Sequence, residues 1–256
     1  MKKITCLLAV ATLLFTSCSS SDDTDNNSNV VLPTKFVQTY PSGQIYGGTV
    51  EYDGNKLKKI TDIEDNKEYS LYFYTGDLIT KIESYYDGNL DYLTTYEYNT
   101  NKQLVKEIET DIAAKKVDML TTYVYNANQT VSEKRIEYSS SNTEYITNKT
   151  YTLVNGEISK IVTDDAIETY IYDSKNSPFK NVLGFDKIYE LIESYGSKSI
   201  LIENKREYTY QSTTSNSGRK LKYTYNQAGY PTFGEGEDYY NDNIEETFTY
   251  TFEYNQ

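Results

Sequence analysis

Aromatic residues recur along this chain in a short pattern that alternates with other residues. Each copy reads aromatic, any residue, aromatic, then a tight turn of Asn, Asp or Gly before an apolar residue that Lys-Ile often follows. Asn, Asp and Gly tolerate the positive φ angles that hairpin turns require. Every copy therefore predicts a strand, a hairpin turn and a second strand. The central residues of the copies are Tyr52, Tyr74, Tyr98, Tyr125, Val154, Tyr172 and Tyr225.

Polar breaks between the copies separate strands of about eight to ten residues. Consecutive antiparallel strands are the usual neighbours in a sheet. We therefore expect an all-β fold over residues 34–256, an extended antiparallel meander of hairpin repeats that forms one large twisted or curved sheet. An open sheet has unpaired edges, so the final strand, "TFTYTFEYN", is a candidate to pair with the N-terminal strand or with another chain.

Alternation within the strands assigns side chains to faces. In "YLTTYEY", the residues Tyr92, Thr94, Tyr96 and Tyr98 share one side of the strand. We expect one concave face that buries aliphatic side chains and another that carries Tyr, Thr, Lys and Glu. Exposed tyrosines suit recognition of a glycan, peptide or protein, and the same rings also suit cross-strand packing. The candidate binding face comprises Tyr72, Tyr74, Tyr96, Tyr98, Tyr123 and Tyr125.

One stretch, residues 177–199, interrupts the strand pattern. Within it, Ile188, Leu191 and Ile192 fall on one side of a helix, and Gly196 is a candidate C-cap. The spacing predicts a short helical insertion near residues 185–196. Such a helix would cover the apolar face of the sheet or plug one end of it.

The N-terminus has the features of a targeting segment. Lys2 and Lys3 precede the apolar run "ITCLLAVATLLF", which is too short to span a bilayer as a stable helix. The run ends in "LFTSC", which resembles a bacterial lipobox. Residues 1–17 are thus a predicted lipoprotein signal peptide, and Cys18 is the predicted lipid-anchor residue in the membrane. The alternative is an ordinary signal peptide with a chance cysteine.

The residues after Cys18 are polar, acidic and poor in bulky side chains, so residues 18–33 predict a disordered tether. Their first part resembles the export signal that sends lipoproteins of Bacteroidota to the outer face of the outer membrane. A solvated linker without address content is the alternative. The residues of the candidate export signal are Ser19, Ser20, Ser21, Asp22 and Asp23.

Composition excludes several classes of function. The net charge of −13 disfavours nucleic acid as a partner. The chain has no histidine, which excludes histidine-based catalytic triads and histidine metal sites. Its two cysteines lie at Cys6, within the signal, and at the lipidated Cys18. We expect no metal site and no cofactor.

Paired carboxylates are the catalytic chemistry that remains. The candidates are Glu235, Glu237 and Asp238 in "FGEGEDYY", and Asp164 and Asp165 in "VTDDAI". A glycosidase needs two carboxylates about 5–10 Å apart in a cleft, whereas acidic residues in turns are usually solvated. We therefore expect no enzymatic activity.

The repeated "Y-x-Y-[DN]-x-x-x-x-L-x-K-I" pattern resembles the tyrosine-aspartate (YD, RHS-like) repeats. Together with the lipobox, "NSPFKN" and "YTYNQAGYPT", it makes the chain similar to uncharacterised tyrosine-rich lipoproteins of Bacteroidota. This resemblance implies a β-repeat domain and brings no activity with it.

These observations predict a lipid-anchored, surface-exposed β-repeat protein of the outer membrane with a binding or structural role. Extracellular glycans, peptides or proteins are its candidate partners. One alternative is a periplasm-facing carrier of a lipophilic or peptide ligand inside a curved sheet, and the other is a carboxylate-dependent hydrolase. A large apolar concavity would favour the carrier, and a cleft with two facing carboxylates would favour the hydrolase.

Overall fold

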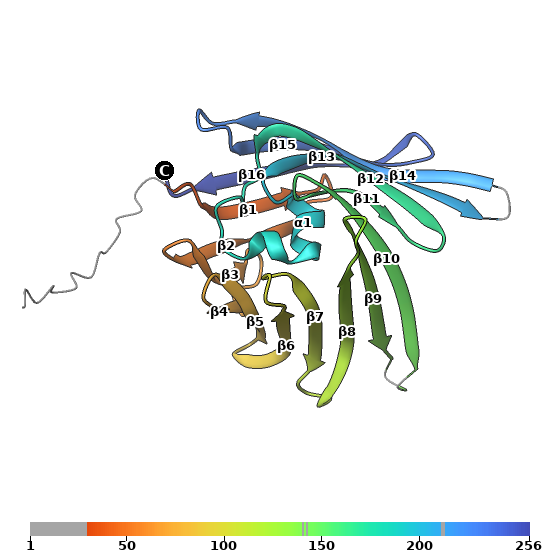
Figure 1. Ribbon diagram of the computed structural model, residues 1–256. Helices are drawn as coiled ribbons and strands as arrows, with labels where there is room; N and C mark the ends of the chain where they lie inside the picture. Colours follow the sequence, from red (N-terminus) through yellow and green to blue (C-terminus); the bar gives the residue numbers. More distant parts are fainter. Residues whose placement is uncertain (1–29, 140, 142, 211–212) are drawn as a thin grey trace, which may run out of the picture.

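A computed structural model describes residues 30–139, 141, 143–210 and 213–256 of the protein. Within these residues, sixteen strands form one closed β-barrel (Figure 1), and a short helical segment joins two of them. The predicted signal peptide, the lipid-anchor residue Cys18 and the predicted export residues 19–23 lie outside the described residues.

Each strand pairs in antiparallel direction with the strands before and after it in the chain, as the meander predicted. The strands are β1 (Pro33–Thr39), β2 (Ile45–Asp53), β3 (Lys56–Asp62), β4 (Glu68–Thr75), β5 (Leu78–Tyr86), β6 (Asn89–Tyr98), β7 (Leu104–Asp111), β8 (Lys116–Tyr125), β9 (Thr130–Tyr138), β10 (Glu144–Val154), β11 (Glu157–Val162), β12 (Ala166–Asn176), β13 (Ser199–Tyr210), β14 (Thr213–Tyr225), β15 (Pro231–Tyr240) and β16 (Asn243–Tyr254).

The sheet is closed, and the expectation of an open twisted or curved sheet is wrong. Strand β16 pairs with β1, with Phe36 opposite Phe252 and Thr39 opposite Thr249. Of the two partners considered for the final strand, the N-terminal strand is the one it pairs with. The twist between neighbouring strands accumulates over the sheet until its first and last strands meet, and closure leaves no unpaired edge.

The closed barrel also contradicts the resemblance to the YD-repeat, RHS-like lipoproteins. The tyrosine pattern that suggested it marks a hairpin, and a hairpin is a local structure that occurs in open sheets and in barrels alike. The pattern therefore identified the building unit correctly and did not determine how the units are assembled.

Tyrosine hydroxyls explain why the pattern repeats. In five strands that end in a tyrosine pair, the second tyrosine donates a hydrogen bond to a backbone carbonyl at the start of the preceding strand, with oxygen–oxygen distances of 2.7–3.0 Å. These bonds join neighbouring strands at the same end of the barrel, whereas Tyr74 and Tyr225 donate to Leu183 and Asp173. The donor–acceptor pairs are Tyr52 with Pro33, Tyr98 with Ile79, Tyr125 with Leu104, Tyr172 with Ile158 and Tyr254 with Pro231.

The two ends of the barrel differ. The turns that follow the tyrosine pairs lie at one end, together with the first described residues and the C-terminus (Figure 1). Leu32 and Asn255 join these two parts of the chain, because the Leu32 amide donates to the Asn255 side chain over 2.9 Å. We call this the terminal end, and we call the other the opposite end.

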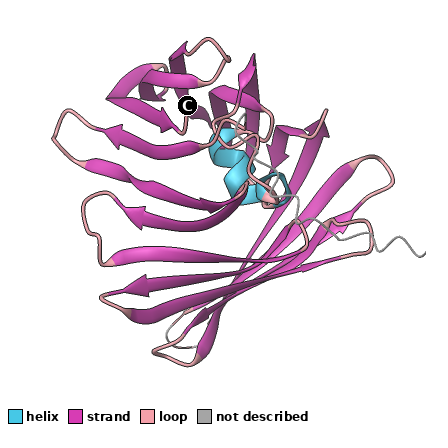
Figure 2. Ribbon diagram, turned by 90° about the vertical axis from the view of Figure 1, so that its left-hand side faces the viewer, coloured by secondary structure: helices cyan, strands magenta, loops and turns pink. Residues whose placement is uncertain are grey.

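The segment between β12 and β13 enters the barrel from the terminal end. It contains a 3₁₀ turn, η1 (Phe185–Lys187), and the helix α1 (Tyr189–Tyr195), which Figure 2 shows surrounded by strands. The predicted helical insertion is thus present, and Gly196 follows α1 as its C-cap with a positive φ of 73°. The helix is a plug inside the barrel.

The core lies between α1 and the inner wall of the barrel. The Tyr189 ring of α1 stacks on Tyr123 and Tyr151 of the wall, with ring centroids 5.1 and 4.7 Å apart. Ile79 and Leu104 are fully buried in the same cluster. Tyrosines and aliphatic side chains therefore share the inner face, and the expectation that they occupy opposite faces of the sheet is wrong.

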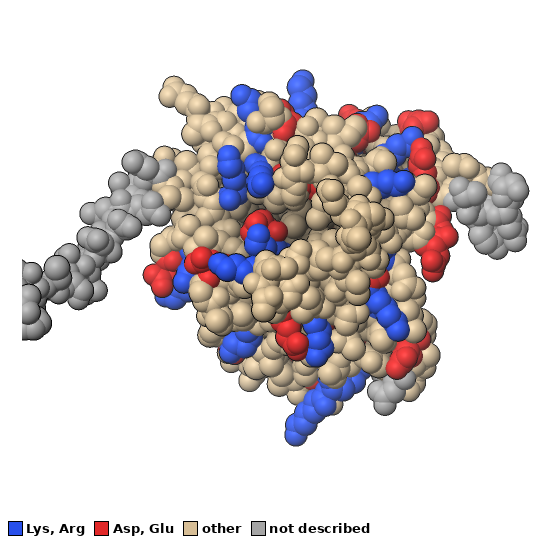
Figure 3. All heavy atoms as spheres, viewed as in Figure 1, with Lys and Arg blue, Asp and Glu red and all other residues tan. Residues whose placement is uncertain are grey.

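The outer wall carries charged pairs beside exposed apolar side chains such as Ile146 and Ile171. Lys106 of β7 stands opposite Glu97 of β6 and pairs with it over 3.1 Å, and both side chains are exposed. Lys35 and Glu253 form a similar pair over 3.3 Å across the β1–β16 junction. Figure 3 shows acidic and basic side chains dispersed over one face of the molecule. None of the helices in the described residues has the length and apolar character required to cross a membrane.

Candidate functional site

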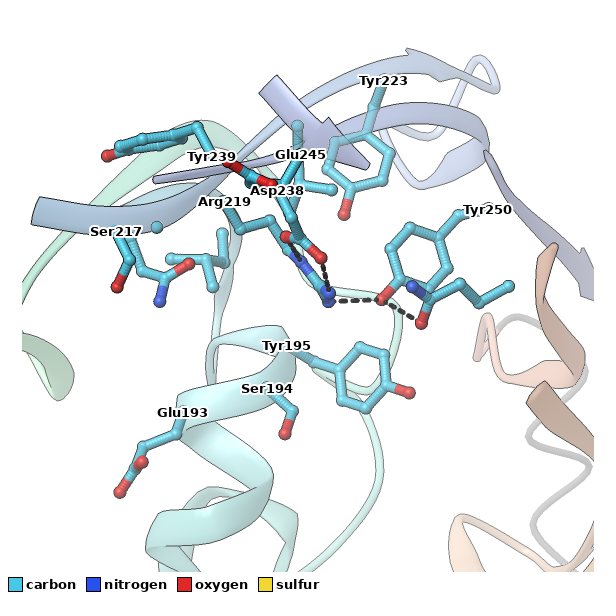
Figure 4. A pocket seen from close by; sticks show the side chains of 15 residues that line it. Glu193, Ser194, Tyr195, Ser217, Arg219, Tyr223, Asp238, Tyr239, Glu245 and Tyr250 are labelled. Carbon is cyan, nitrogen blue, oxygen red and sulfur yellow. Dashed lines mark hydrogen bonds and ion pairs between the residues drawn. The ribbon is translucent and has the colours of Figure 1, made fainter. Parts of the chain in front are cut away.

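A cavity of about 650 Å³ lies inside the barrel, between the last turn of α1 and the strands on one side of the wall (Figure 4). We call it the Arg219 cavity. Its wall comes from strands far apart in sequence, with Gln38 on β1, Arg219 and Tyr223 on β14, and Tyr250 on β16. The volume falls in the range of about 300–1,000 Å³ typical of small-molecule sites.

Arg219 holds the centre of the cavity wall. It stands opposite Asp238 in the β14–β15 pair, and its Nε and Nη2 atoms donate to the two carboxylate oxygens over 2.8 Å each. A two-fold contact of this kind fixes both side chains in one plane. Burial lowers the pKa of Arg219, but the hydrogen bonds that it donates to Asp238, together with the charges of Tyr250 and Asp238, outweigh this effect and raise the pKa, so the guanidinium stays charged.

A chain of hydrogen bonds extends from Arg219 along the wall. Arg219 Nη1 donates to the Tyr250 hydroxyl over 3.2 Å, and this hydroxyl donates to Gln38 Oε1 over 2.9 Å (Figure 4). Gln38 Nε2 then donates to the Tyr40 hydroxyl over 2.7 Å. Burial raises the pKa of Tyr250, so its hydroxyl remains protonated at neutral pH. The chain thus presents fixed polar atoms to the cavity.

The helix supplies the facing side of the cavity. Glu193, Ser194 and Tyr195 from its last turn line the space (Figure 4). Glu193 accepts hydrogen bonds from the Tyr151 hydroxyl over 2.8 Å and from Lys149 over 3.3 Å. Burial raises the pKa of Glu193, and Lys149 partly offsets that effect. These contacts fix α1 against the wall and so define one side of the cavity.

Two glycines of β15 let aromatic rings pack against the strand beside the cavity. A Cβ atom at Gly236 would lie 2.1 Å from the Phe248 ring, and one at Gly234 would lie 2.6 Å from the Tyr223 ring. Both rings therefore lie close against the glycine backbone of β15, a packing in which aromatic rings cover strand glycines. Tyr223, held in this way, is one of the residues that line the cavity.

The cavity extends toward the opposite end of the barrel. Ser217 and Glu245, which also line it, lie close to the turns of that end, and Glu245 is exposed to solvent. The helical plug, in contrast, enters from the terminal end, between Asn176 and Ser199. The cavity is therefore open on the side away from the two termini.

The six tyrosines of the candidate binding face lie elsewhere in the barrel. They belong to the inner wall on β4, β6 and β8, where they pack around α1. Tyr96 and Tyr123 are buried, and the Tyr74 hydroxyl donates to the Leu183 carbonyl over 3.1 Å. These tyrosines pack in the core around α1, and their role as a binding face stays a prediction. The six are Tyr72, Tyr74, Tyr96, Tyr98, Tyr123 and Tyr125.

The carboxylates singled out in the sequence do not gather in one cleft. Asp164 and Asp165 are exposed in the turn between β11 and β12. Glu235 and Glu237 stand opposite Lys222 and Lys220 in the β14–β15 register. Asp238 alone among the five lines the Arg219 cavity, where its carboxylate is occupied by Arg219.

Sequence reasoning missed Arg219, although one signal pointed to it. In "RKLKYTY", Arg219 alternates in phase with the tyrosines that face inward, so its side chain falls on the inner face. A charged residue at an inward position needs a partner. Asp238, 19 residues later, is that partner, and only the pairing of β14 with β15 brings the two together.

A second polar cluster lies on the other side of the helix. Arg135 contacts the carboxylates of Glu133 and Glu190. Burial raises the pKa of Glu107 to about 8, with a further contribution from Glu190, and the Tyr123 hydroxyl donates to Glu107 over 3.4 Å. In the described part of the chain, no group of three or more acidic side chains is arranged to hold a metal ion.

No protein-family model matches the chain, and no curated protein matches it. Among solved structures, it is similar to a porin-like protein from Bacteroides uniformis ATCC 8492, with 15% sequence identity, a TM-score of 0.40, and coverage of 87% of this chain and 97% of that chain. A porin-like protein from Bacteroides vulgatus ATCC 8482 matches with 13% identity, a TM-score of 0.45, and coverage of 88% and 99%. At these values the likeness carries no conclusion about function.

Proposed function

We propose that this chain is a lipid-anchored outer-membrane protein whose barrel stands in water and binds a ligand in the Arg219 cavity. The observation that carries the proposal is the sidedness of the barrel wall. Its inner face holds the buried tyrosines and aliphatic side chains, and its outer face carries charged pairs such as Lys106 with Glu97 among exposed apolar side chains such as Ile146. The cavity then provides a site that a ligand in water can reach.

The charged residues of the outer wall stand in the middle of strands. Lys134 is the fifth residue of β9, and it is exposed. Lys220 and Glu237 stand opposite each other well inside β14 and β15. In a barrel that spans a bilayer, the outward side chains form an apolar band about 25 Å tall, and a Lys at the middle of this band costs about 2–4 kcal/mol. Several such residues disfavour a position within the lipid.

The lipid anchor at Cys18 connects this barrel to the membrane in our proposal. The first described strand begins at Pro33, so about fifteen residues separate the anchor from the barrel, a span of up to about 50 Å when extended. The predicted export signal at residues 19–23 supports display on the outer face of the membrane. The Arg219 cavity would then open away from the anchored end.

The proposed role is binding without catalysis. Asp238 lies in the cavity, but both of its carboxylate oxygens accept hydrogen bonds from Arg219. A catalytic carboxylate needs access to its substrate, and Arg219 occupies that position at Asp238. The net charge of −13 again argues against nucleic acid as the partner.

The test is fractionation of cells that produce the Cys18→Ala variant. A barrel held only by its lipid is expected to move almost completely into the soluble fraction, and a folded barrel there retains cooperative thermal unfolding. Retention of the folded variant in outer membranes would show that the wall itself is embedded, and the proposal would then be wrong.

Display on the cell surface is tested separately, by protease treatment of intact cells. A protease too large to cross the outer membrane is expected to degrade the wild-type protein on intact cells while a periplasmic control survives. Protection until the cells are lysed would instead place the barrel in the periplasm and favour the periplasm-facing alternative.

A further inference from the structure

We infer that the Arg219 cavity binds a neutral saccharide, a ligand class that deepens the proposed binding function and rests on it. The inference combines three properties of the cavity: fixed hydrogen-bonding groups of both kinds, charges that already neutralise one another, and tyrosine rings on facing sides. Each property excludes a different class of ligand.

The hydrogen-bonding groups suit hydroxyl groups. Arg219 has five N–H donors, and the bonds to Asp238 and Tyr250 use three of them, which leaves about two. Each oxygen of Asp238 retains a further lone pair, and Gln38 offers both an amide donor and an acceptor. A sugar hydroxyl donates one hydrogen bond and accepts others, so neighbouring hydroxyls match adjacent donors and acceptors on one wall.

The charges of the cavity disfavour ionic ligands. Arg219 is already paired with Asp238, so an anion would have to displace a carboxylate that contacts the guanidinium at two points. A cation would likewise have to displace a partner, because Asp238 is paired with Arg219 and Glu193 with Lys149. The remaining carboxylate, Glu245, is exposed at the open side. Charges that are already paired favour a neutral ligand, because an ionic ligand would have to break an existing pair.

Tyrosine rings provide the apolar contacts. Tyr195 comes from α1, while Tyr223 and Tyr250 come from the wall, and Figure 4 shows these rings around one space. The face of a sugar ring carries C–H groups that pack on an aromatic ring, while the tyrosine hydroxyl stays available for hydrogen bonds. A wholly lipophilic ligand is disfavoured, because it would take water away from the half-buried Arg219–Asp238 pair without replacing its polar contacts.

The position of the cavity fits the end of a glycan chain. The cavity is open toward the opposite end of the barrel, where Ser217 and Glu245 lie, and the plug closes the side toward the termini. A chain end can therefore enter while the rest of the glycan remains in solution. The proposed lipid anchor lies on the other side and does not obstruct this entry.

The test is titration of the full-length lipoprotein in detergent with three sets of soluble oligosaccharides. The sets are neutral (malto-, cello-, xylo- and manno-oligosaccharides), acidic (oligogalacturonates) and basic (chitosan oligomers). Isothermal titration calorimetry measures each affinity. We expect at least one neutral set to bind, and the acidic and basic sets to bind at least tenfold more weakly.

A pair of matched variants locates the binding site. Tyr250→Phe removes the hydroxyl that links Arg219 to Gln38, and we expect it to weaken binding of the neutral oligosaccharide at least tenfold. Tyr85→Phe makes the same chemical change on β5, where the hydroxyl contacts Glu83, outside the cavity, and we expect unchanged affinity. Thermal unfolding of both variants checks that they are folded.

The outcomes separate this inference from the proposed function. Binding of neutral oligosaccharides that Tyr250→Phe weakens and Tyr85→Phe does not would support both. Binding of only the acidic or basic set, with the same loss in Tyr250→Phe, would overturn the neutral class and keep the binding barrel. Equal affinities in the two variants would overturn the site, and no binding by any set would overturn the saccharide inference, while the Cys18→Ala fractionation still tests the anchored barrel.

Discussion

The two sides of the barrel interior are built from the same hairpin unit, but one side is filled by side chains and the other encloses a cavity. On the side of β5–β12, inward positions carry tyrosine, isoleucine and leucine, which pack on α1 and fill the space. On the side of β14–β16, two inward positions are Gly234 and Gly236, and the aromatic rings of neighbouring strands lie against them. The first side is a core, and the second holds the Arg219 cavity.

The difference teaches that a single short helix does not fill a barrel of this size. Barrels of about eight strands are filled by their own side chains, whereas about sixteen leave an open channel. The side chains of the seven-residue helix α1 pack in two clusters, one around Tyr123 and Tyr151 and one that includes Phe36 of β1, and they leave space beside β14–β16. The space left over becomes a cavity, and the residues that face it are free to be polar.

The largest expected effect contrasts one side chain from each region. Ile79→Ala removes a fully buried side chain that packs among the residues around α1, and we expect a loss of about 2–5 kcal/mol in the free energy of unfolding. Leu221 lines the Arg219 cavity and is only half-buried. For Leu221→Ala we therefore expect a smaller loss in the free energy of unfolding, about 1 kcal/mol. Urea denaturation monitored by circular dichroism measures both. Equal losses would show that the two sides are equally well packed.

An intermediate effect is expected from Gly236→Ala on β15. The added methyl group would overlap the Phe248 ring, 2.1 Å away, so the ring must move. We expect a loss of about 1–3 kcal/mol in the free energy of unfolding, measured by urea denaturation. The control is Gly54→Ala, in a hairpin turn where nothing lies within 4 Å of the new methyl group. Its cost is limited to backbone strain at a positive φ. A loss in Gly236→Ala no larger than that in Gly54→Ala would show that the Phe248 ring can move at no cost.

The smallest expected effect is a pH dependence in the packed side. Burial raises the pKa of Glu107 from the ordinary 4.5 to about 8, so the folded state favours the protonated form. Its contribution to stability is present below the ordinary pKa and is lost as the pH rises toward 8. Glu107→Gln stays neutral at every pH. Its free energy of unfolding, measured relative to that of the wild-type protein, is expected to be higher at pH ~9 than at pH ~5 by on the order of 2 kcal/mol. Thermal unfolding at both pH values measures this difference. The exposed Glu97→Gln is the control, and equal pH profiles for the two variants would contradict the prediction.

The sequence by itself determined the local structure. The tyrosine pattern predicted the hairpins because alternation and turn residues act over a few positions, and a second tyrosine such as Tyr98 reaches only to the adjacent strand. The same local rules placed Tyr92, Thr94 and Tyr96 on one face and predicted α1 with its C-cap at Gly196. They also made the first strand one of two candidate partners for the last.

The tertiary structure alone decided closure, and with it the site. Whether sixteen strands form an open sheet or a barrel depends on twist and register accumulated over more than 200 residues, which no local pattern encodes. Closure turned the tyrosine face inward. It also placed Gln38 from the start of the domain beside Tyr250 from its end, 212 positions away. The cavity exists because these distant strands meet around a helix too small to fill the space between them.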